Sequence, residues 1–168
     1  MTYLNLSYIS LCIALLNGCS IYSFSGASIS EETETVSINY IRNEADLIEP
    51  NLSNRLTEAL IQKCQTETDL IIVDSGSADI NFSGKITEYE VQPIAIQNNE
   101  TAAQNRLTIA VEINYINNTN KTDNFTQLFT QYADFNSNTN LSEVEEILNN
   151  LIIEEIIEDI FNRSFMNW

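Results

Sequence analysis

The chain contains three cysteines, whose thiols can react covalently, and the residues before Cys19 form a recognisable motif. The tetrapeptide Leu-Asn-Gly-Cys at 16–19 resembles a lipobox, in which a signal peptidase cuts before a cysteine whose thiol carries diacylglycerol. The apolar run at 9–16 is shorter than the roughly 20 residues of a spanning helix and is typical of a secretory signal. We therefore expect residues 1–18 to be a signal peptide and Cys19 to be the lipidation site.

Two features of this segment leave another interpretation open. No lysine or arginine precedes Arg42, so the amino terminus is the only positive charge ahead of the apolar run, and Asn17 is unusual in a lipobox. The alternative is a buried N-terminal strand or helix.

The other two cysteines are not expected to form a disulfide. Cys12 would leave with the signal peptide, so Cys64 alone would remain in the folded body. Cys64 continues the four-residue spacing of Leu52, Leu56 and Leu60, which predicts a buried helical position rather than a reactive thiol.

Composition excludes several classes of function. The chain has 24 acidic and 7 basic residues, a formal net charge of −17, which opposes binding to nucleic acid or to an anionic membrane surface. The attached lipid must therefore supply the membrane affinity. Histidine is absent, so histidine-based catalytic triads and the commonest zinc ligand are excluded. The four glycines lie singly, and we expect no catalytic residues and no cofactor.

Two acidic segments carry side chains that could form a metal or catalytic site. Residues 134–145 have oxygen-bearing side chains at near-calcium-loop spacing, from Asp134 to Glu145, but Thr139 occupies the glycine position. Ser142 and Glu145 are also explained as a capping box, so we predict no metal site. The last helix carries acidic residues that could suggest acid–base catalysis, but a solvated face is the favoured interpretation. These residues are Glu154, Glu155, Glu158 and Asp159.

Apolar periodicity predicts the first half of the fold. Alternation at 35–41 indicates a strand with Val36, Ile38 and Tyr40 on one face, and 51–66 has helical spacing. The continuous apolar run at 69–74 predicts a buried strand parallel to the first.

The second half contains three longer strands, at 80–91, 106–116 and 124–135, followed by an amphipathic helix at 142–165. Gly84 marks a bulge or a close backbone approach. The last helix is predicted to bury an apolar face, whose residues are Val144, Ile147, Leu148, Leu151, Ile152, Ile156, Ile160, Phe161 and Phe165. We expect an α+β fold with two helices on one face of a mixed four- to five-stranded sheet.

The polar segment 91–106 is longer than an ordinary hairpin loop, and such loops are often functional. Pro93 should end regular strand pairing, Ile94 and Ile96 would supply an apolar anchor, and Arg106 one charge. The alternative is a solvated loop in which Arg106 only pairs with a nearby glutamate.

Several phrases, in order, resemble the lipopolysaccharide-assembly lipoprotein LptE family in its Bacteroidota form. They are CSIYSFSGASI (19–29), NLSNRLTEAL (51–60), SGKITEYEVQPIAIQNNETAAQNRLTI (83–109), QYADF (131–135) and NW (167–168). The resemblance implies two helices on a mixed sheet, an anchor in the inner leaflet of the outer membrane, and a periplasm-facing domain. It also implies a β-barrel partner, LptD, whose lumen the lipoprotein plugs, and no enzymatic step.

The resemblance places the loop against the barrel lumen or lipopolysaccharide. The loop residues concerned are Pro93, Ile94, Ile96, Gln97, Asn98, Asn99 and Arg106. Direct lipopolysaccharide contact is doubtful because the chain has few basic residues. The expected organisation is a signal peptide at 1–18, an acylated flexible tether at 19–34 and one domain at 35–168. The alternative function is a periplasmic lipoprotein binding module of another envelope complex.

Overall fold

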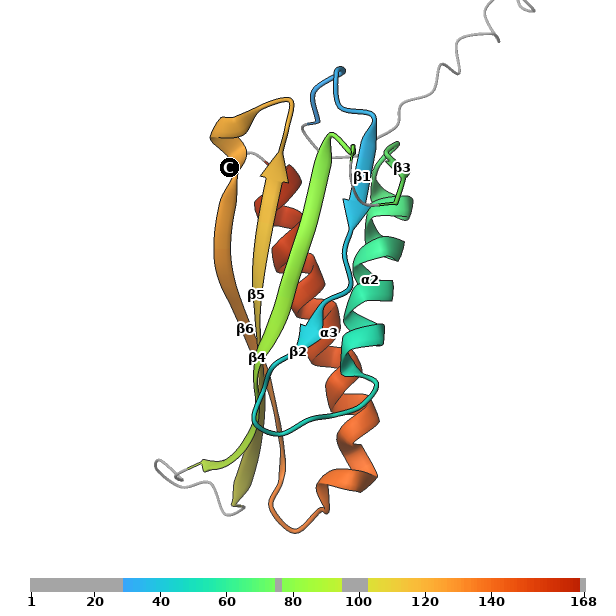
Figure 1. The fold of residues 1–168 in the computed structure, drawn as a ribbon. Helices are drawn as coiled ribbons and strands as arrows, with labels where there is room; N and C mark the ends of the chain where they lie inside the picture. Colours follow the sequence, from blue (N-terminus) through green and yellow to red (C-terminus); the bar gives the residue numbers. More distant parts are fainter. Residues whose placement is uncertain (1–28, 75–76, 95–102, 167–168) are drawn as a thin grey trace, which may run out of the picture.

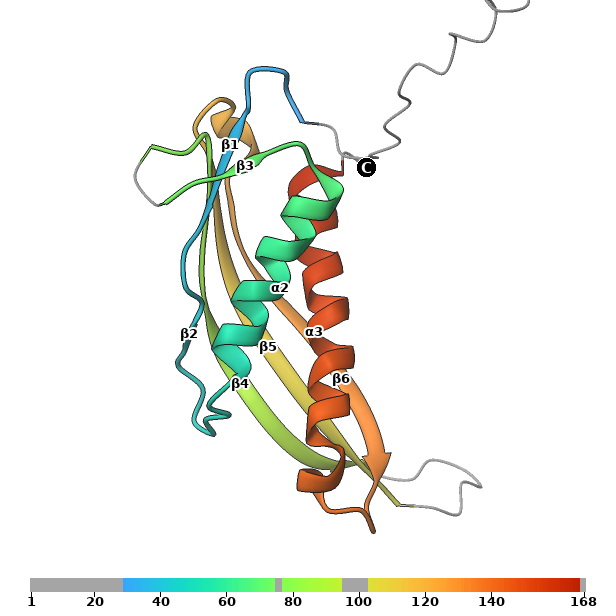
Figure 2. The same cartoon turned by 90° about the vertical axis from the view of Figure 1, so that its right-hand side faces the viewer.

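The protein is one mixed sheet with two helices packed against one of its faces (Figures 1 and 2). The computed structural model describes residues 29–74, 77–94 and 103–166. In chain order the elements are β1 (Thr35–Ile38), β2 (Arg42–Asn43), α2 (Leu52–Glu67), β3 (Ile71–Ile72), β4 (Ile80–Ile94), β5 (Gln104–Asn117), the 3₁₀ turn η2 (Lys121–Asp123), β6 (Phe125–Asn136) and α3 (Leu141–Phe165). The predicted α+β class, with both helices on one face, is confirmed.

The sheet contains six strands in two kinds of pairing. Its order is β3-β1-β4-β5-β6, and β2 also pairs with β4. The short strands β1, β2 and β3 pair in parallel, and the long strands β4, β5 and β6 are antiparallel. The predicted parallel pairing of the strand before α2 with the strand after it is confirmed by β1 and β3.

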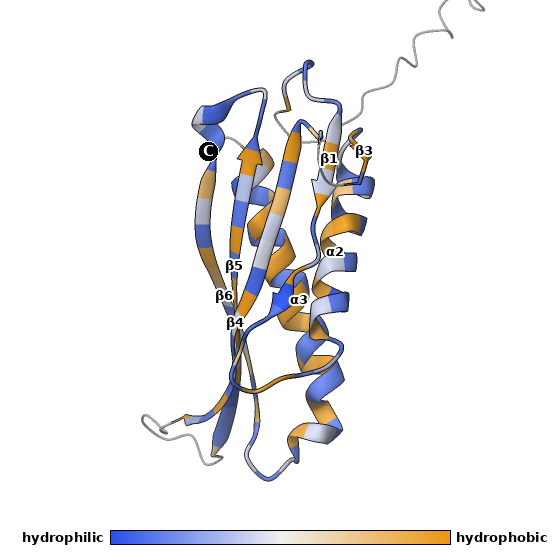
Figure 3. Ribbon diagram, viewed as in Figure 1, coloured by the Kyte–Doolittle hydropathy of each residue, from blue (hydrophilic) through white to orange (hydrophobic). Residues whose placement is uncertain are grey.

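The core lies between the long strands and the helices. The inward residues of β5 alternate as predicted, and all five are buried: Leu107, Ile109, Val111, Ile113 and Tyr115. Figure 3 shows this alternation as bands of hydrophobic and hydrophilic colour along β4 and β5. Against them α2 presents Leu52, Leu56 and Leu60, each with a fully buried side chain. The alternate apolar residues of β5 and the apolar residues spaced four apart on α2 therefore pack together in one core.

Cys64 lies in the same core, at the end of the buried stripe of α2. Burial raises the pKa of its thiol to about 12, so the nucleophilic thiolate is not populated at neutral pH. The prediction of a buried position is confirmed.

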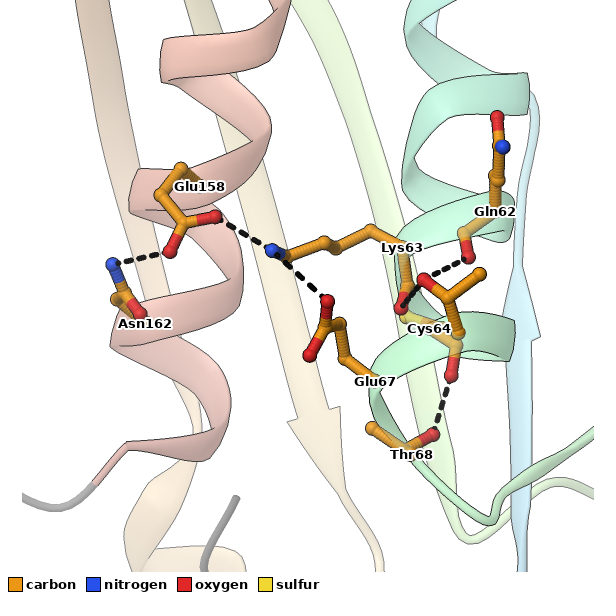
Figure 4. A network of polar contacts seen from close by, with 8 residues as sticks. Gln62, Lys63, Cys64, Glu67, Thr68, Glu158 and Asn162 are labelled. Carbon is orange, nitrogen blue, oxygen red and sulfur yellow. Dashed lines mark hydrogen bonds and ion pairs between the residues drawn. The ribbon is translucent and has the colours of Figure 1, made fainter. Parts of the chain in front are cut away.

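An ion pair also joins the two helices. Lys63 Nζ on α2 lies 2.6 Å from a carboxylate oxygen of Glu158 on α3 and 3.7 Å from one of Glu67 (Figure 4). The hydrogen bond from Lys63 lowers the pKa of Glu158 below its usual value. Part of the predicted solvated acidic face therefore holds α3 against α2.

The buried face of α3 differs from the predicted one. Ile147 and Leu151 are 62% and 52% exposed, whereas Ile153 and Ile157 are buried. Apolar residues nearly surround this helix, so spacing alone did not show which stripe meets the sheet. The predicted capping box is also wrong, because α3 begins after Asn140 and that residue donates to Glu143 at 2.8 Å.

The two strands predicted at 35–41 and 69–74 are both shorter in the structure, as β1 and β3. The chain leaves the sheet after Ile38, so Tyr40 is exposed and Ile41 is buried instead. The predicted buried strand at 69–74 is reduced to Ile71–Ile72. Because β3 lies at the edge of the sheet, Ile71 is exposed.

Strand β4 runs farther than predicted, through Pro93 to Ile94. The expectation that Pro93 ends pairing is wrong, since it stands opposite Asn105 in the β4–β5 register. Beyond Glu88, β5 is the only strand that pairs with β4 in the part of the chain the structure describes. A strand with one free side tolerates proline, which cannot donate to a second neighbour.

Gly84 occupies a site of close backbone approach, one of the two predicted alternatives. A Cβ atom at this position would lie 2.6 Å from the carbonyl oxygen of Glu112 and 2.7 Å from Cδ1 of Ile113. The register shift instead falls between Ile86 and Glu88.

We expect Gly84→Ala to lower the free energy of unfolding by about 1–3 kcal/mol, because a backbone oxygen of β5 must move. Urea unfolding followed by circular dichroism measures the change. The control, Gln127→Ala at an exposed position of β6, should stay within about 0.5 kcal/mol of wild type. Equal stability of the Gly84 variant and wild type would contradict the close approach.

Candidate functional site

The long strands separate two ends of the molecule, which we call the tether end and the loop end. The tether end contains Ile29, the first described residue, with η2 and the carboxyl end of α3. The loop end contains the facing termini of β4 and β5 and the start of α3 (Figures 1 and 2). The 15 residues of β4, at about 3.3 Å each, hold the two ends roughly 45 Å apart.

At the tether end, Asp79 fixes the chain where β1 begins. One carboxylate oxygen accepts hydrogen bonds from the backbone N–H of Glu34 at 3.0 Å and of Thr35 at 2.9 Å, and from the Thr35 hydroxyl at 2.7 Å. These bonds, that of the Thr35 side chain first, lower the pKa of Asp79 below its usual value. Asp79 precedes β4, so the start of the domain is tied to its longest strand.

At the loop end, the described predicted residues lie close together. Pro93 and Ile94 stand opposite Asn105 and Gln104, one and two positions beyond the pair formed by Gln92 and Arg106. The remaining predicted residues, Ile96, Gln97, Asn98 and Asn99, lie outside the described residues, and so does Cys19.

Arg106 is held on the outer face of the sheet by two groups of β6. Its guanidinium donates to both carboxylate oxygens of Asp134, at 2.8 and 3.0 Å, and lies 3.5 Å from the ring centroid of Tyr132. The hydrogen bond to Asp134 raises the pKa of Arg106 above its usual value. The partner of Arg106 is therefore an aspartate on the paired strand, whereas the alternative interpretation of the loop named a nearby glutamate.

Side-chain contacts also engage both ends of residues 134–145, the segment with near-calcium-loop spacing. Both oxygens of Asp134 accept from Arg106, while Glu145 accepts from the Tyr89 hydroxyl at 2.7 Å. Within residues 29–74, 77–94 and 103–166, no group of three or more histidine, cysteine, aspartate or glutamate side chains is placed to hold a metal ion.

A polar cluster beneath the sheet escaped the sequence analysis. Asn149 on α3 is only 1% exposed and lies near Tyr89 and Glu145. Burial raises the pKa of Tyr89 above its usual value, and the hydrogen bond to Glu145 adds to this shift. No periodic signal marks Asn149, because it sits on a helix face otherwise lined by isoleucines.

A second feature missed from the sequence is an apolar stripe on the outer surface of α3. Ile147 and Leu151, one helical turn apart, are both more than half exposed. These residues belong to the first half of α3, which begins at Leu141 at the loop end (Figure 1). Exposed apolar side chains in such a group mark a surface suited to contact with another molecule.

Other proteins with this fold are found among solved structures. A solved protein from Xanthomonas campestris has the same architecture, with a TM-score of 0.54 and 6% identity, over 79% of this chain and 84% of its own. A minor lipoprotein from Acinetobacter baumannii aligns with a TM-score of 0.49 and 11% identity, over 79% of this chain and 92% of its own. Lipoprotein B from Nitrosomonas europaea aligns with a TM-score of 0.45 and 15% identity, over 77% of this chain and 80% of its own. A search of curated proteins found no match.

The family follows from the sequence itself. The sequence model of the family LptE, described as lipopolysaccharide-assembly, matches residues 33–164. The chain belongs to this family, which confirms the resemblance found from the sequence. Its members are non-enzymatic proteins of lipopolysaccharide assembly that work with LptD at the cell envelope, so the chain is not an enzyme. Among the described helices none is both long and apolar enough to cross a membrane.

We expect Asp79→Asn to flatten the acid side of the stability profile. Because folding lowers the pKa of Asp79, its contribution is present above the unfolded-state pKa, about 4, and is lost as the pH falls below it. Melting temperatures between pH 7 and pH 2.5 should therefore fall less steeply in the variant. Glu90→Gln, at an exposed position of β4, is the control, and a variant slope equal to that of wild type would contradict the role of Asp79.

Proposed function

We propose that this protein is an outer-membrane lipoprotein that plugs an LptD-like β-barrel from the periplasmic side and supports lipopolysaccharide export. In this proposal residues 1–18 are the signal peptide, 19–34 the acylated tether, and 35–168 the plug domain. The observation that carries the proposal is the separation of about 45 Å between tether end and loop end in a member of the LptE family.

The tether end suits attachment to a bilayer. Cys19 lies ten positions before Ile29, and ten residues span at most about 35 Å, so an anchored Cys19 keeps the tether end beside the membrane. A diacyl group with an amide-linked acyl chain, palmitate or similar, supplies stable anchoring. The net charge of −17 gives no attraction to an anionic lipid surface, so the lipid is needed.

The loop end suits insertion into a lumen. A rigid pair of strands carries the loop farther than the roughly 30 Å of a hydrocarbon core, and Pro93, Ile94 and Arg106 surround its base. The guanidinium of Arg106 is already committed to Asp134, and the chain has only seven basic residues. The plug role is therefore better supported than direct binding of lipopolysaccharide phosphates.

The apolar stripe of α3 provides a surface for the barrel wall. Ile147 and Leu151 lie on the same half of the molecule as the loop end and carry no charge. Burying them against a partner would release the water that now covers two large aliphatic side chains.

Affinity purification of the chain from its native cells should recover a large β-barrel in near-equal amount, and depletion should leave lipopolysaccharide unexported. We expect the double substitution Ile147→Ser and Leu151→Ser to reduce barrel recovery about tenfold, because contact anchors dominate binding energy. Both side chains are exposed, so the fold should persist.

Glu58→Ser with Gln62→Ser, two exposed positions one turn apart on α2, is the matched control and should recover the barrel as wild type does. Recovery of a different envelope complex, or normal surface lipopolysaccharide after depletion, would contradict the proposed function.

A further inference from the structure

In the described part of the chain, β6 is an edge strand of the sheet, with one side unpaired along its whole length. Within the residues that the structure describes, its only partner is β5, from Phe125 opposite Tyr115 to Asn136 opposite Gln104. Alternate residues of an antiparallel edge strand turn their N–H and C=O groups away from the neighbour. We call this row of groups along 125–136 the β6 edge; Figure 1 shows β6 at the outer margin of the sheet.

The β6 edge lacks the features that normally prevent pairing with another chain. Natural edge strands carry lysine, proline, bulges or inward charges, or are very short. β6 has 12 residues and contains no lysine, proline or glycine. Its one charged residue, Asp134, is neutralised by Arg106 on β5.

The opposite side of the same sheet carries these features. The edge strand β3 has only two residues. Where β4 is uncovered, it contains the register shift between Ile86 and Glu88 and, farther on, Pro93. One edge of the sheet is therefore protected and the other is left competent to pair.

The residues of β6 favour an extended partner. Leu128 and Tyr132 are 54% and 53% exposed on the face away from the helices, and Thr126 and Thr130 on the same face are also exposed. Tyrosine and threonine have high strand propensity, and their side chains can pack against those of an added strand.

We propose that the β6 edge binds an extended segment of the barrel protein by strand addition, and that this segment is neutral or basic. The proposal rests on the proposed function and names where that partner binds. A closed barrel has no free strand edge, so the segment is a loop or terminal extension of the barrel protein.

The negative charge of the chain favours a neutral or basic segment of the barrel protein over a second copy of the chain as the partner of the β6 edge. Asp123 lies two positions before the first residue of β6, and Asp159 of α3 accepts a hydrogen bond from Gln131 of β6 at 2.7 Å. Edge-to-edge pairing of two copies would bring together molecules that each carry a net charge of −17, and their mutual repulsion opposes it.

Hydrogen–deuterium exchange read by mass spectrometry tests the proposal on the wild-type lipoprotein, free and in its purified barrel complex. In the complex, about half of the β6 amides, those turned from β5, should exchange at least ~100-fold more slowly. The comparison peptide covers the opposite edge at Ile71–Ile72, whose exchange should change much less.

Three outcomes would overturn the proposal. Unchanged β6 exchange in an intact complex would exclude strand addition while leaving the proposed function standing. Protection of β6 already present in the free chain, rising with its concentration, would assign the edge to a second copy. Failure to recover any barrel complex would remove the proposed function itself, and the β6 proposal with it.

Discussion

The antiparallel pairing of β4 with β5 is the interaction on which the rest of the structure depends. It sets which side chains of β5 face the helices, and a slip of one residue would turn Leu107, Ile109 and Val111 to solvent. The close contact of Gly84 with Glu112 and Ile113 favours this register. The same pairing fixes the distance between the tether end and the loop end, so the stability of the core and the shape of the proposed plug have one physical cause.

The sequence correctly predicted the elements whose apolar residues lie on one face only, because that face must be the buried one. The alternation of β5 and the four-residue spacing of α2 each leave only one face to bury, and both were confirmed. The apolar residues of α3 instead lie around most of the helix, so Ile147 and Leu151 were placed in the core although they are exposed. Pro93 was misjudged because its cost depends on whether β4 has a second neighbour there, and that is a property of the sheet order.

The candidate site was less accessible to sequence reasoning than the fold. The loop was found by its length and polarity, but the partner of Arg106 depends on a cross-strand register joining residues 28 positions apart. The polar cluster around Asn149 and the open β6 edge leave no local pattern either, because each is defined by elements distant in the sequence. Cys19 and four loop residues lie outside the described residues and stay predictions.

Membership of the LptE family and the long two-ended fold lead to one central claim, that the loop end lies inside a barrel lumen. A photoreactive amino acid in place of the exposed Gln104, introduced in native cells, tests it most directly. We predict a crosslink to an LptD-like barrel, mapping by mass spectrometry to residues that face its lumen. Crosslinks only to periplasmic proteins, or to the outer surface of the barrel, would contradict the account.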